Sequence, residues 1–480
     1  MNRPLPDPRV TTLSSNDATH AAETSGGELY QKHKKVYVRE VHGLFATLRN
    51  AAMVVLLGLY YGMAWINWDG HQTVLFDLPA RKFYLFGLVF WPQDFIYLSA
   101  LLIIAAIALF MFTSLAGRLW CGYACPQTVW TEIYMLMERW TEGDGRKQHK
   151  LDQGRHDARY YRIKITKHTL WLVFSLWTGF TFVGYFTPIR ELAHNFITWN
   201  LGSWETFWIF FYSLATYGNA GFLREQVCIY MCPYARFQSA MFDRDTLIIS
   251  YDIKRGEARS RKPKKNAENG KKIGDCVDCG LCVRVCPTGI DIRNGLQYQC
   301  IGCAACVDIC DQVMEKIGKP KGLIRYTTEN ALEGRSVHIL RPRLFVYIGI
   351  LTLVTSLLFR AILSRTPLEV DIIRDRSALY TENAMGLIEN IYQLKIINMD
   401  QYPHDFEIAI EGIEDISLIG KSPLVVHVES GEVLDVPVRV QVDPESITSR
   451  STQIFFNVLA HDRPELFRHE PARFLGPVSR

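Results

Sequence analysis

Five stretches of the chain are mostly apolar and contain no Asp, Glu, Lys or Arg. They cover residues 51–68, 95–117, 169–189, 206–223 and 344–359. A helix that crosses a bilayer needs about 17–25 such residues. The fifth stretch can extend past Arg360, because a long basic side chain can reach the membrane interface. Five runs of this length are improbable as buried helices of one soluble protein. The pattern therefore predicts a membrane α-helical core of about five transmembrane helices.

Basic residues alternate between the segments that separate these stretches. Segments 146–167 and 254–272 hold eight and nine Lys or Arg, whereas 69–94 and 190–205 hold two and one. By the positive-inside rule, this alternation places the N-terminus in the cytoplasm and the C-terminus across the membrane. The basic runs could instead bind nucleic acid, but their alternation with apolar stretches favours topology. A lipid bilayer is thus a predicted partner and nucleic acid is not.

Two shorter segments fit this count less simply. Residues 83–93 are apolar but too short to span, so we expect them to lie in the membrane interface. Residues 119–137 are moderately apolar and carry one charged side chain, Glu132. A span there would invert the orientation of everything that follows, and the basic segment 146–167 argues against it.

The region from about residue 365 has a different period. Apolar and polar residues alternate at 393–398, 406–410 and 433–442, with Gly412, Gly420, Gly431 and Pro444 between the runs. Alternation of this kind is typical of half-buried strands separated by turns, and several such strands predict a small β-sandwich. The region holds no cysteine and no catalytic constellation, so we expect a docking or interaction domain.

Composition excludes little by itself. The 480 residues are 48% hydrophobic and 21% charged with a net charge of +4, which excludes low-complexity and collagen-like chains. A near-zero mean hydropathy is here an average over apolar spans, basic loops and a polar β-domain.

All 12 cysteines fall in the predicted cytoplasmic parts, and eight of them occupy 35 residues. The cytoplasm is reducing, so clustered cysteines there indicate metal or redox sites before disulfides. The eight form two C-x2-C-x2-C-x3-C runs, which is the spacing of bacterial two-cluster ferredoxins. In that arrangement the fourth cysteine of each run ligates the other cluster. The spacing assigns Cys276, Cys279, Cys282 and Cys310 to one [4Fe-4S] cluster, and Cys300, Cys303, Cys306 and Cys286 to the second.

Zinc fits these runs poorly, because zinc sites usually pair CxxC units. Two neighbouring clusters have one main use, one-electron transfer. Asp311 stands where a proline would usually follow the last cysteine, which changes a turn residue and not a ligand.

The other four cysteines form a repeated CxxxCP motif, at Cys121 and Cys125 after the second apolar stretch and at Cys228 and Cys232 after the fourth. Cysteines four apart on a helix share a face, so two such pairs side by side could present four thiolates to one metal. Soft sulfur ligands favour Cu(I), zinc or iron-sulfur centres. Buried inert thiols are the plainer alternative, but the repetition at equivalent topological positions argues against them.

The chain resembles the FixG/RdxA/CcoG family of cytochrome c oxidase accessory proteins. The resemblance covers nearly everything after residue 30, and its most specific part is the block Ala116-Gly-Arg-Leu-Trp-Cys-Gly-Tyr-Ala-Cys-Pro-Gln-Thr-Val-Trp-Thr-Glu. It also rests on Trp68-Asp-Gly, Leu78-Pro-Ala-Arg-Lys-Phe-Tyr, Phe90-Trp-Pro-Gln-Asp, Cys232-Pro-Tyr-Ala-Arg-Phe-Gln and the paired cluster motifs.

The resemblance implies a multi-pass protein of the bacterial inner membrane that serves assembly of cbb3-type oxidase by reducing Cu(II) to Cu(I). It implies that the CxxxCP cysteines are the copper site, that the C-terminal domain is immunoglobulin-like and periplasmic, and that Asp311 is family usage. Copper ions, copper chaperones or oxidase subunits and an unidentified electron donor are the implied partners.

Two alternatives remain beside cupric reduction. In the first, the CxxxCP thiolates hold an additional iron centre in a relay between quinol and a periplasmic partner. In the second, the protein is a non-catalytic assembly scaffold whose C-terminal domain docks immature oxidase subunits.

The predicted organisation has five parts. They are a polar cytoplasmic tail (1–44), a four-helix membrane core with both CxxxCP motifs (45–250), a cytoplasmic 2[4Fe-4S] ferredoxin-like domain (251–340), a fifth transmembrane helix (341–364) and a periplasmic β-sandwich (365–480).

Overall fold

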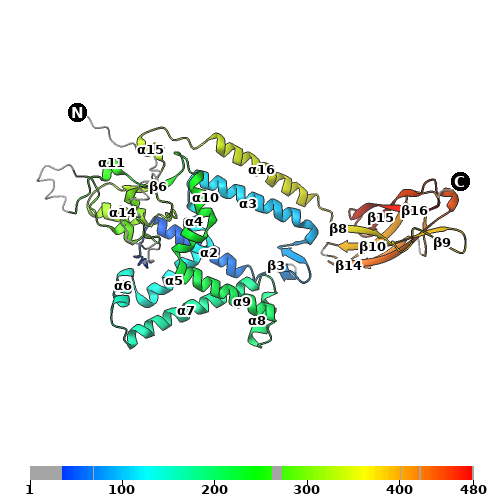
Figure 1. The fold of residues 1–480 in the computed structure, drawn as a ribbon, viewed down its shortest axis with the longest axis horizontal. Coiled ribbons are helices and arrows are strands. Elements are labelled where there is room, and N and C mark those ends of the chain that lie inside the picture. Colours follow the sequence, from blue (N-terminus) through cyan, green and yellow to red (C-terminus); the bar gives the residue numbers. More distant parts are fainter. Residues whose placement is uncertain (1–34, 69, 262–272, 401, 421–422, 478–480) are drawn as a thin grey trace, which may run out of the picture.

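The computed structural model describes residues 35–68, 70–261, 273–400, 402–420 and 423–477. Figure 1 shows a cysteine-rich domain of short elements at one end, a β-domain at the other, and long helices that run between them. Most of the predicted tail, residues 1–34, lies outside the described residues. Residues 35–43 have no regular secondary structure and lead into the first long helix, α2 (Leu44–Gly62).

Within the described ranges, three helices are long and apolar enough to cross a membrane. They are α2, α3 (Phe95–Ala116) with the turn that precedes it, and α16 (Pro342–Leu363). Almost none of their apolar residues is buried inside the protein, as expected for side chains that face lipid. Helices α3 and α16 pack side by side along their length. These helices confirm three of the predicted spans as membrane-compatible segments.

The third and fourth predicted spans take a different form. Residues 169–189 begin in the second half of α7 (Ala158–Val183), whose first half is basic. Residues 206–223 divide between α9 (Ser203–Thr216) and a π-helix, η2 (Tyr217–Leu223). Neither is among the three membrane-compatible helices of the described chain, so the count of five stays a prediction.

Helices α7 and α9 pack closely, and α8 (Ile189–Ile197) connects them. Gly179 permits this approach, because a Cβ there would lie 2.4 Å from Ser213 Oγ. The outer surface of α9 is apolar, with Phe210 and Leu214 exposed.

The two shorter segments also have defined structures. Residues 83–93 include β4 (Lys82–Leu85) and β5 (Leu88–Phe90), which join β3 (Val74–Asp77) in a small antiparallel sheet. Residues 119–137 form a short helix, α4 (Leu119–Tyr123), and most of α5 (Pro126–Glu142). Helix α5 packs against α7. It buries charged residues such as Glu138, so it is not a uniformly apolar helix.

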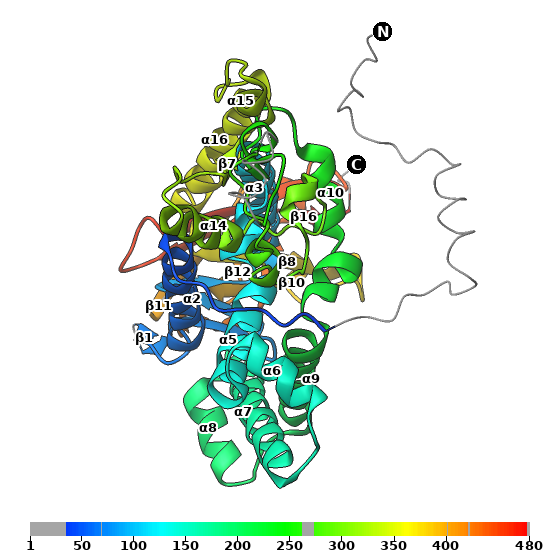
Figure 2. The same ribbon diagram turned by 90° about the vertical axis from the view of Figure 1, so that its left-hand side faces the viewer.

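The cysteine-rich domain is closed by two strands from its ends. Strand β6 (Ile248–Tyr251) pairs antiparallel with β7 (Ile324–Thr327). Between them lie the short α13 (Leu281–Arg284) and the longer α14 (Ala305–Lys316). Figure 2 shows α14 at the start of α2, where the domain meets the long helices.

The C-terminal domain is a β-sandwich, as the alternation predicts. One sheet has the strand order β12-β14-β10-β8, with β9 on the edge of β10, and the other has the order β13-β11-β15-β16. The strands are β8 (Leu368–Arg374), β9 (Thr381–Glu382), β10 (Ile388–Asn398), β11 (His404–Glu411), β12 (Ser417–Leu418), β13 (Leu424–Val428), β14 (Val433–Val442), β15 (Ser451–Ala460) and β16 (Phe467–Leu475).

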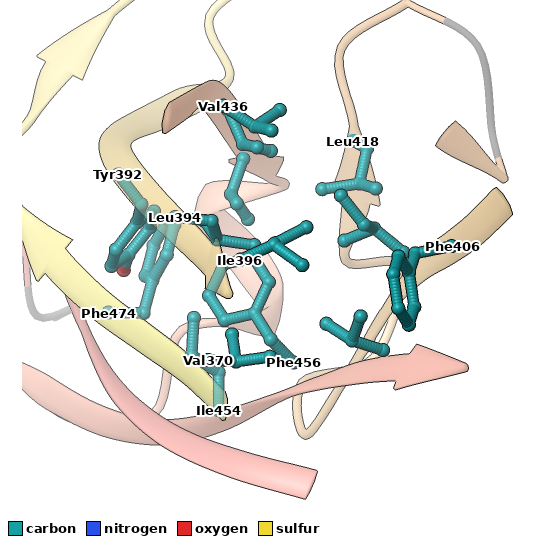
Figure 3. Close-up of a cluster of buried hydrophobic side chains, with 14 of the residues drawn as sticks. Val370, Tyr392, Leu394, Ile396, Phe406, Leu418, Val436, Ile454, Phe456 and Phe474 are labelled. Atoms are coloured by element: carbon teal, nitrogen blue, oxygen red, sulfur yellow. The ribbon is translucent and has the colours of Figure 1, made fainter. Parts of the chain in front are cut away.

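Alternate residues of these strands form a single apolar core. In β14, Val436, Val438, Val440 and Val442 are buried, while the residues between them are more exposed. Side chains from both sheets meet at the centre of the domain (Figure 3). The domain therefore has a hydrophobic core of its own.

Candidate iron-sulfur and thiol site

The eight clustered cysteines surround two cavities. The first cavity is lined by Cys276, Cys279, Cys282 and Cys310. The second is lined by Cys286, Cys300, Cys303 and Cys306, with Cys282 also at its border. Each cavity thus receives three cysteines from one run and the fourth from the other run. The shared border places the two cavities next to each other.

The local backbone explains how each triplet curls around its cavity. Gly280 and Ala304 both adopt the left-handed conformation, with φ of 65° and 57°. Each directly follows a middle cysteine and precedes a helix, so the chain reverses between the second and third cysteines of both runs. The two halves therefore use the same turn at the same point of the motif.

Burial raises the pKa of several of these thiols. It raises the pKa of Cys282 to about 11, and those of Cys303 and Cys310 to about 12. The thiol of Cys306 also has a raised pKa for the same reason. A metal that binds such cysteines must displace their protons, since the thiolate is the ligand.

The donor set of each cavity fits a [4Fe-4S] cluster. Four cysteines from the two runs line an apolar space, whose walls include Ile292 and Ile301 in the second cavity and Leu323 and Ile324 in the first. Cysteine thiolates are the usual ligands of such clusters. The residues present therefore suit two clusters of this kind.

The two CxxxCP motifs have the same backbone structure, but it is not the predicted one. Cys125 and Cys232 are extended residues that precede α5 and α10 (Pro233–Met241), and each helix begins at the motif's proline. Their amide groups bond to the carbonyl groups of Trp120 and Val227, five residues earlier in both cases. The prediction that each pair shares one helix face is wrong, because a proline disfavours helical geometry in the residue before it.

The fold nevertheless brings the four CxxxCP cysteines into one electrostatic neighbourhood. Cys121 lies in α4, and Cys228 lies in the π-helix η3 (Val227–Met231). Burial, and then the nearby Cys125, raises the pKa of Cys121 to about 12 and that of Cys228 to about 11. Within the described residues, no three Cys, His, Asp or Glu side chains converge closely enough for a single metal ion.

Arg118 connects the CxxxCP cysteines to the second cavity. Its buried guanidinium donates to the carbonyl oxygens of Cys300 (3.2 Å), Tyr298 and Ala235 (2.6 Å). One side chain thus ties a cluster loop to the helix that follows the second motif. Arg118 is a functional residue that was not predicted, although a lone arginine at the end of an apolar stretch, three residues before Cys121, is a signal in the sequence.

Two further polar contacts join the cysteine-rich domain to α2. Asp308 in α14 accepts hydrogen bonds from the amides of Phe45 (3.2 Å) and Ala46 (2.7 Å), which are unpaired donors at the start of α2. Arg49 donates to the carbonyl oxygen of Cys303. Gly43 is required there, since a Cβ would lie 2.4 Å from the Asp308 carboxyl carbon. A helix of the membrane part is therefore capped by the cysteine-rich domain.

A larger cavity of about 330 Å³ lies where these parts meet. Both Cys228 and Cys303 line it, together with residues of the segment before α2, of α2 and of α5. It is polar as well as apolar, with Arg49, Glu132 and Arg139 in its wall. A solvent-sized space thus connects a CxxxCP thiol with a cysteine of the second cavity.

A group of buried charges stabilises the packing of α5 on α7. Glu138 is 2% exposed and pairs with Arg224 at 2.9 Å and with Lys167 at 3.3 Å. Burial alone would raise the pKa of Glu138, but Arg224, Lys35 and Lys167 together hold it at about 2. The carboxylate is therefore charged at all physiological pH values.

Comparison with known proteins identifies the same parts. The family models that match are a 4Fe-4S dicluster domain over residues 223–329, a 4Fe-4S binding domain over 98–141, and the IG-like fold at the C-terminus of FixG over 358–477. The first of these covers all eight clustered cysteines.

Related proteins match most of the chain. Protein RdxB of Cereibacter sphaeroides is 41% identical, over 86% of this chain and 90% of its own length. Nitrogen fixation protein FixG of Rhizobium meliloti is 37% identical, over 85% of both chains. Protein RdxA of C. sphaeroides is also 37% identical, over 85% and 87%. The crystal structure of a FixG-related protein from Vibrio parahaemolyticus matches with 33% identity over 23% of this chain and 95% of its own, at a TM-score of 0.21.

Proposed function

This chain belongs to the family of FixG, RdxA and RdxB, and from that premise we propose that it is a membrane-bound iron-sulfur protein that reduces Cu(II) to Cu(I) for assembly of cbb3-type cytochrome c oxidase. The 4Fe-4S models and the family support the coarser statement, an iron-sulfur electron-transfer protein. The observation that carries the finer one is that Cys228, a CxxxCP cysteine, and Cys303, a cysteine of the second cavity, line one common cavity.

We assign the cluster ligands as the cavities group them. Cys276, Cys279, Cys282 and Cys310 would hold one [4Fe-4S] cluster, and Cys286, Cys300, Cys303 and Cys306 the other. When bound, such clusters supply one-electron transfer. The protein's own contribution is to exclude water with apolar walls and to fix the loops through Arg118 and Arg49.

Copper is the proposed substrate, and the CxxxCP cysteines are its proposed site. Each Cu(II) takes up one electron and becomes Cu(I), and a donor outside the described chain is oxidised by the same number of electrons. Thiolate ligands favour the cuprous ion, so sulfur at the site stabilises the product. The cavity that Cys228 lines gives an ion a route to these thiols.

We propose that the protein spans the bacterial inner membrane with its cysteines on the cytoplasmic side. The membrane-compatible helices α3 and α16 lie between the cysteine-rich domain and the β-sandwich (Figure 1), which suits two domains on opposite sides of a bilayer. The basic segments favour the cytoplasm for the cysteines. The β-sandwich would then be periplasmic, where it can contact copper chaperones or oxidase subunits.

A single-turnover assay tests the copper site. The full-length protein is reduced anaerobically, freed of excess reductant, and mixed with Cu(II) and a chromogenic Cu(I) chelator. We expect the replacement of Cys121, Cys125, Cys228 and Cys232 by Ser to abolish fast Cu(I) formation while the cluster spectrum persists. Tyr230→Phe, at an exposed position inside the second motif, is the matched control. Unchanged rates and copper binding in the Ser variant would refute the assignment.

A second candidate function is the relay with a further iron centre. One observation favours it: a 4Fe-4S binding model matches residues 98–141, which include Cys121 and Cys125. Iron and sulfide analysis separates the two candidates. About eight irons per chain fit two cubanes, whereas a reproducible excess that Cys121→Ser removes would favour the relay.

A further inference from the structure

A second large cavity lies among the helices, away from the cysteine-rich domain. Its volume is about 360 Å³, and residues of α2, α5, α7, α9 and η2 line it. The size is within the range of small-molecule sites, about 300–1,000 Å³. None of the twelve cysteines lines it, so it is separate from the site described above.

Four aromatic side chains form part of the wall of this cavity. Tyr60, Trp130, Phe182 and Tyr212 contribute rings from four different helices. Phe182 and Tyr212 are in direct contact, with ring centroids 3.9 Å apart, and Tyr60 meets Trp130 edge to face at 5.5 Å. Such a wall suits a planar ring, because aromatic groups attract one another in stacked and edge-to-face geometries.

Two carboxamide side chains line the cavity, Gln127 of α5 and Asn219 of η2, besides the hydroxyl groups of Thr178 and Thr216. The Gln127 amide nitrogen donates to the carbonyl oxygens of Asn219 (2.9 Å) and Arg224 (3.2 Å). Within the described parts of the chain, its carboxamide oxygen accepts no hydrogen bond. Among the described residues, no hydrogen bond is recorded for the Asn219 side chain, which lies in a π-helix, an element frequent at functional sites. The cavity thus offers both an acceptor and a donor beside its aromatic wall.

The position of the cavity favours a lipid-soluble ligand. Phe211 and Leu214 neighbour the lining residues Tyr212 and Ala215 on α9, and both are exposed apolar side chains. If residues 206–223 span the membrane as the sequence predicts, these side chains face lipid beside the cavity. Gln127 also lines the 330 Å³ cavity whose wall includes Cys228 and Cys303. The two cavities therefore share this residue.

We propose that this cavity binds the head group of a membrane quinol, which serves as the reductant of the protein. The proposal rests on the electron-transfer function proposed above. A hydroquinone is planar, carries two hydroxyl donors for carboxamide oxygens such as that of Gln127, and becomes a quinone whose carbonyls accept from an amide such as that of Asn219. A phospholipid chain would use the apolar wall but leave both carboxamides unpaired, which costs free energy.

The reaction balances with copper as acceptor. One quinol loses two electrons and two protons to become a quinone, and two Cu(II) ions take up the electrons to become two Cu(I) ions. The protons go to water through the 330 Å³ cavity, where the Glu132 carboxylate lies in the wall.

Binding of ubiquinone-1 to the purified full-length protein, measured by isothermal titration in detergent, tests the site without any turnover. We expect one saturable site per chain. Ala215→Trp should weaken binding at least tenfold by filling the cavity, whereas Leu214→Trp, on the exposed side of the same helix, should leave it unchanged. Asn219→Leu should weaken binding about tenfold through the loss of a hydrogen bond, which keeps the test decisive if Ala215→Trp does not fold.

Two outcomes would overturn the proposal: the absence of saturable binding, with only phospholipid retained in the purified protein, and equal binding by the wild type and both cavity variants. Failure of the proposed function has a different signature. If Cu(II) is reduced by neither ubiquinol-1 nor a soluble artificial reductant while ubiquinone-1 still binds, the site stands and the copper assignment falls. If a soluble reductant supports Cu(II) reduction but ubiquinone-1 does not bind, the copper assignment stands and the quinol site falls.

Discussion

The β-sandwich and the cysteine-bearing core are held together by different kinds of interaction. In the sandwich, Tyr392, Phe406 and Phe456 are completely buried and pack between two sheets (Figure 3). In the core, by contrast, the spaces between elements are lined by sulfur, and buried charged groups such as Arg118 and Asp308 connect the parts. One region is filled with hydrocarbon and the other surrounds sites for ligands.

This difference predicts where stability comes from. Burial of apolar surface stabilises the sandwich without any cofactor. The cysteine-rich domain has a small apolar core around its cavities, and metal binding is coupled to folding when ligands must converge. We therefore expect the two regions to respond differently to the loss of metal, to core truncation and to acid.

The largest expected effect is that of Cys306→Ser. This thiol lines the second cavity, and serine is a poor ligand for iron, so iron should fall from about eight to about four per chain. Hydrogen exchange should rise throughout the cysteine-rich domain and remain unchanged in β10 and β15. Iron analysis and exchange mass spectrometry measure both effects. Cys228→Ser, outside the cavity walls of both cluster sites, should keep about eight irons. Equal exchange in both regions would contradict the comparison.

Phe456→Ala should affect the sandwich and leave the cysteine-rich domain unchanged. Loss of this fully buried ring should destabilise the sandwich by about 3–5 kcal/mol, while the iron content stays unchanged. Phe455→Ala is the matched control, because successive side chains of a strand point to opposite faces and Phe455 is less buried. Denaturant unfolding followed through amides of β10 and β15 gives both values. A loss of iron in Phe456→Ala would show that the regions are coupled.

The β-sandwich and the grouping of eight cysteines around two cavities could both be predicted from the sequence, and for the same reason. Alternation of period two in 433–442 and the C-x2-C-x2-C-x3-C spacing are both local patterns, and each specifies its own geometry. The first residues of α5 and α10 could also have been predicted from the sequence, since a proline often occupies the first position of a helix. The prediction of a shared helix face at the CxxxCP motifs failed because it counted the i, i+4 spacing and ignored this proline.

The contacts that join the parts could not be predicted in this way. Arg118 and Cys300 are 182 positions apart in the chain, and Ala46 and Asp308 are 262 apart. No local period relates such residues, and their meeting depends on how helices and domain pack. The same holds for the aromatic cavity, whose lining comes from five elements. The π-helix η2 was not predicted, because the apolar pattern of residues 206–223 is equally compatible with one continuous α-helix.

Acid should lower the stability of the cysteine-bearing core through Glu138. Its pKa is about 2 instead of the ordinary 4.5, so the charged form stabilises the fold above pH 4.5, and this contribution is lost as the pH falls through about 2. We expect Glu138→Gln to destabilise the packing of α5 on α7 by about 3 kcal/mol at pH 7, because it removes the carboxylate that pairs with the largely buried Arg224 guanidinium.

Thermal unfolding of the core between pH 6 and pH 3 measures this effect. The difference between the wild type and Glu138→Gln should shrink as the pH falls below about 4.5. Glu132→Gln, which alters a more exposed ion pair with Arg139, should cost less than about 1 kcal/mol and serves as the control. A difference that does not change with pH would show that Glu138 acts through packing and not through its charge.

Asp308→Ala should give the smallest effect, and it tests the join between the cysteine-rich domain and the long helices. The carboxylate accepts from the amides of Phe45 and Ala46, so its removal leaves two helix donors unpaired and should cost about 1–2 kcal/mol. Exchange of these two amides should accelerate, whereas Asp311→Ala, on the same helix but bonded to Gly322, should leave them protected. If Asp308→Ala instead releases iron as Cys306→Ser does, then docking of the cysteine-rich domain onto α2 is needed to shape the second cavity. In that case α2 belongs with the region whose stability depends on bound metal, and only the sandwich is independent of it.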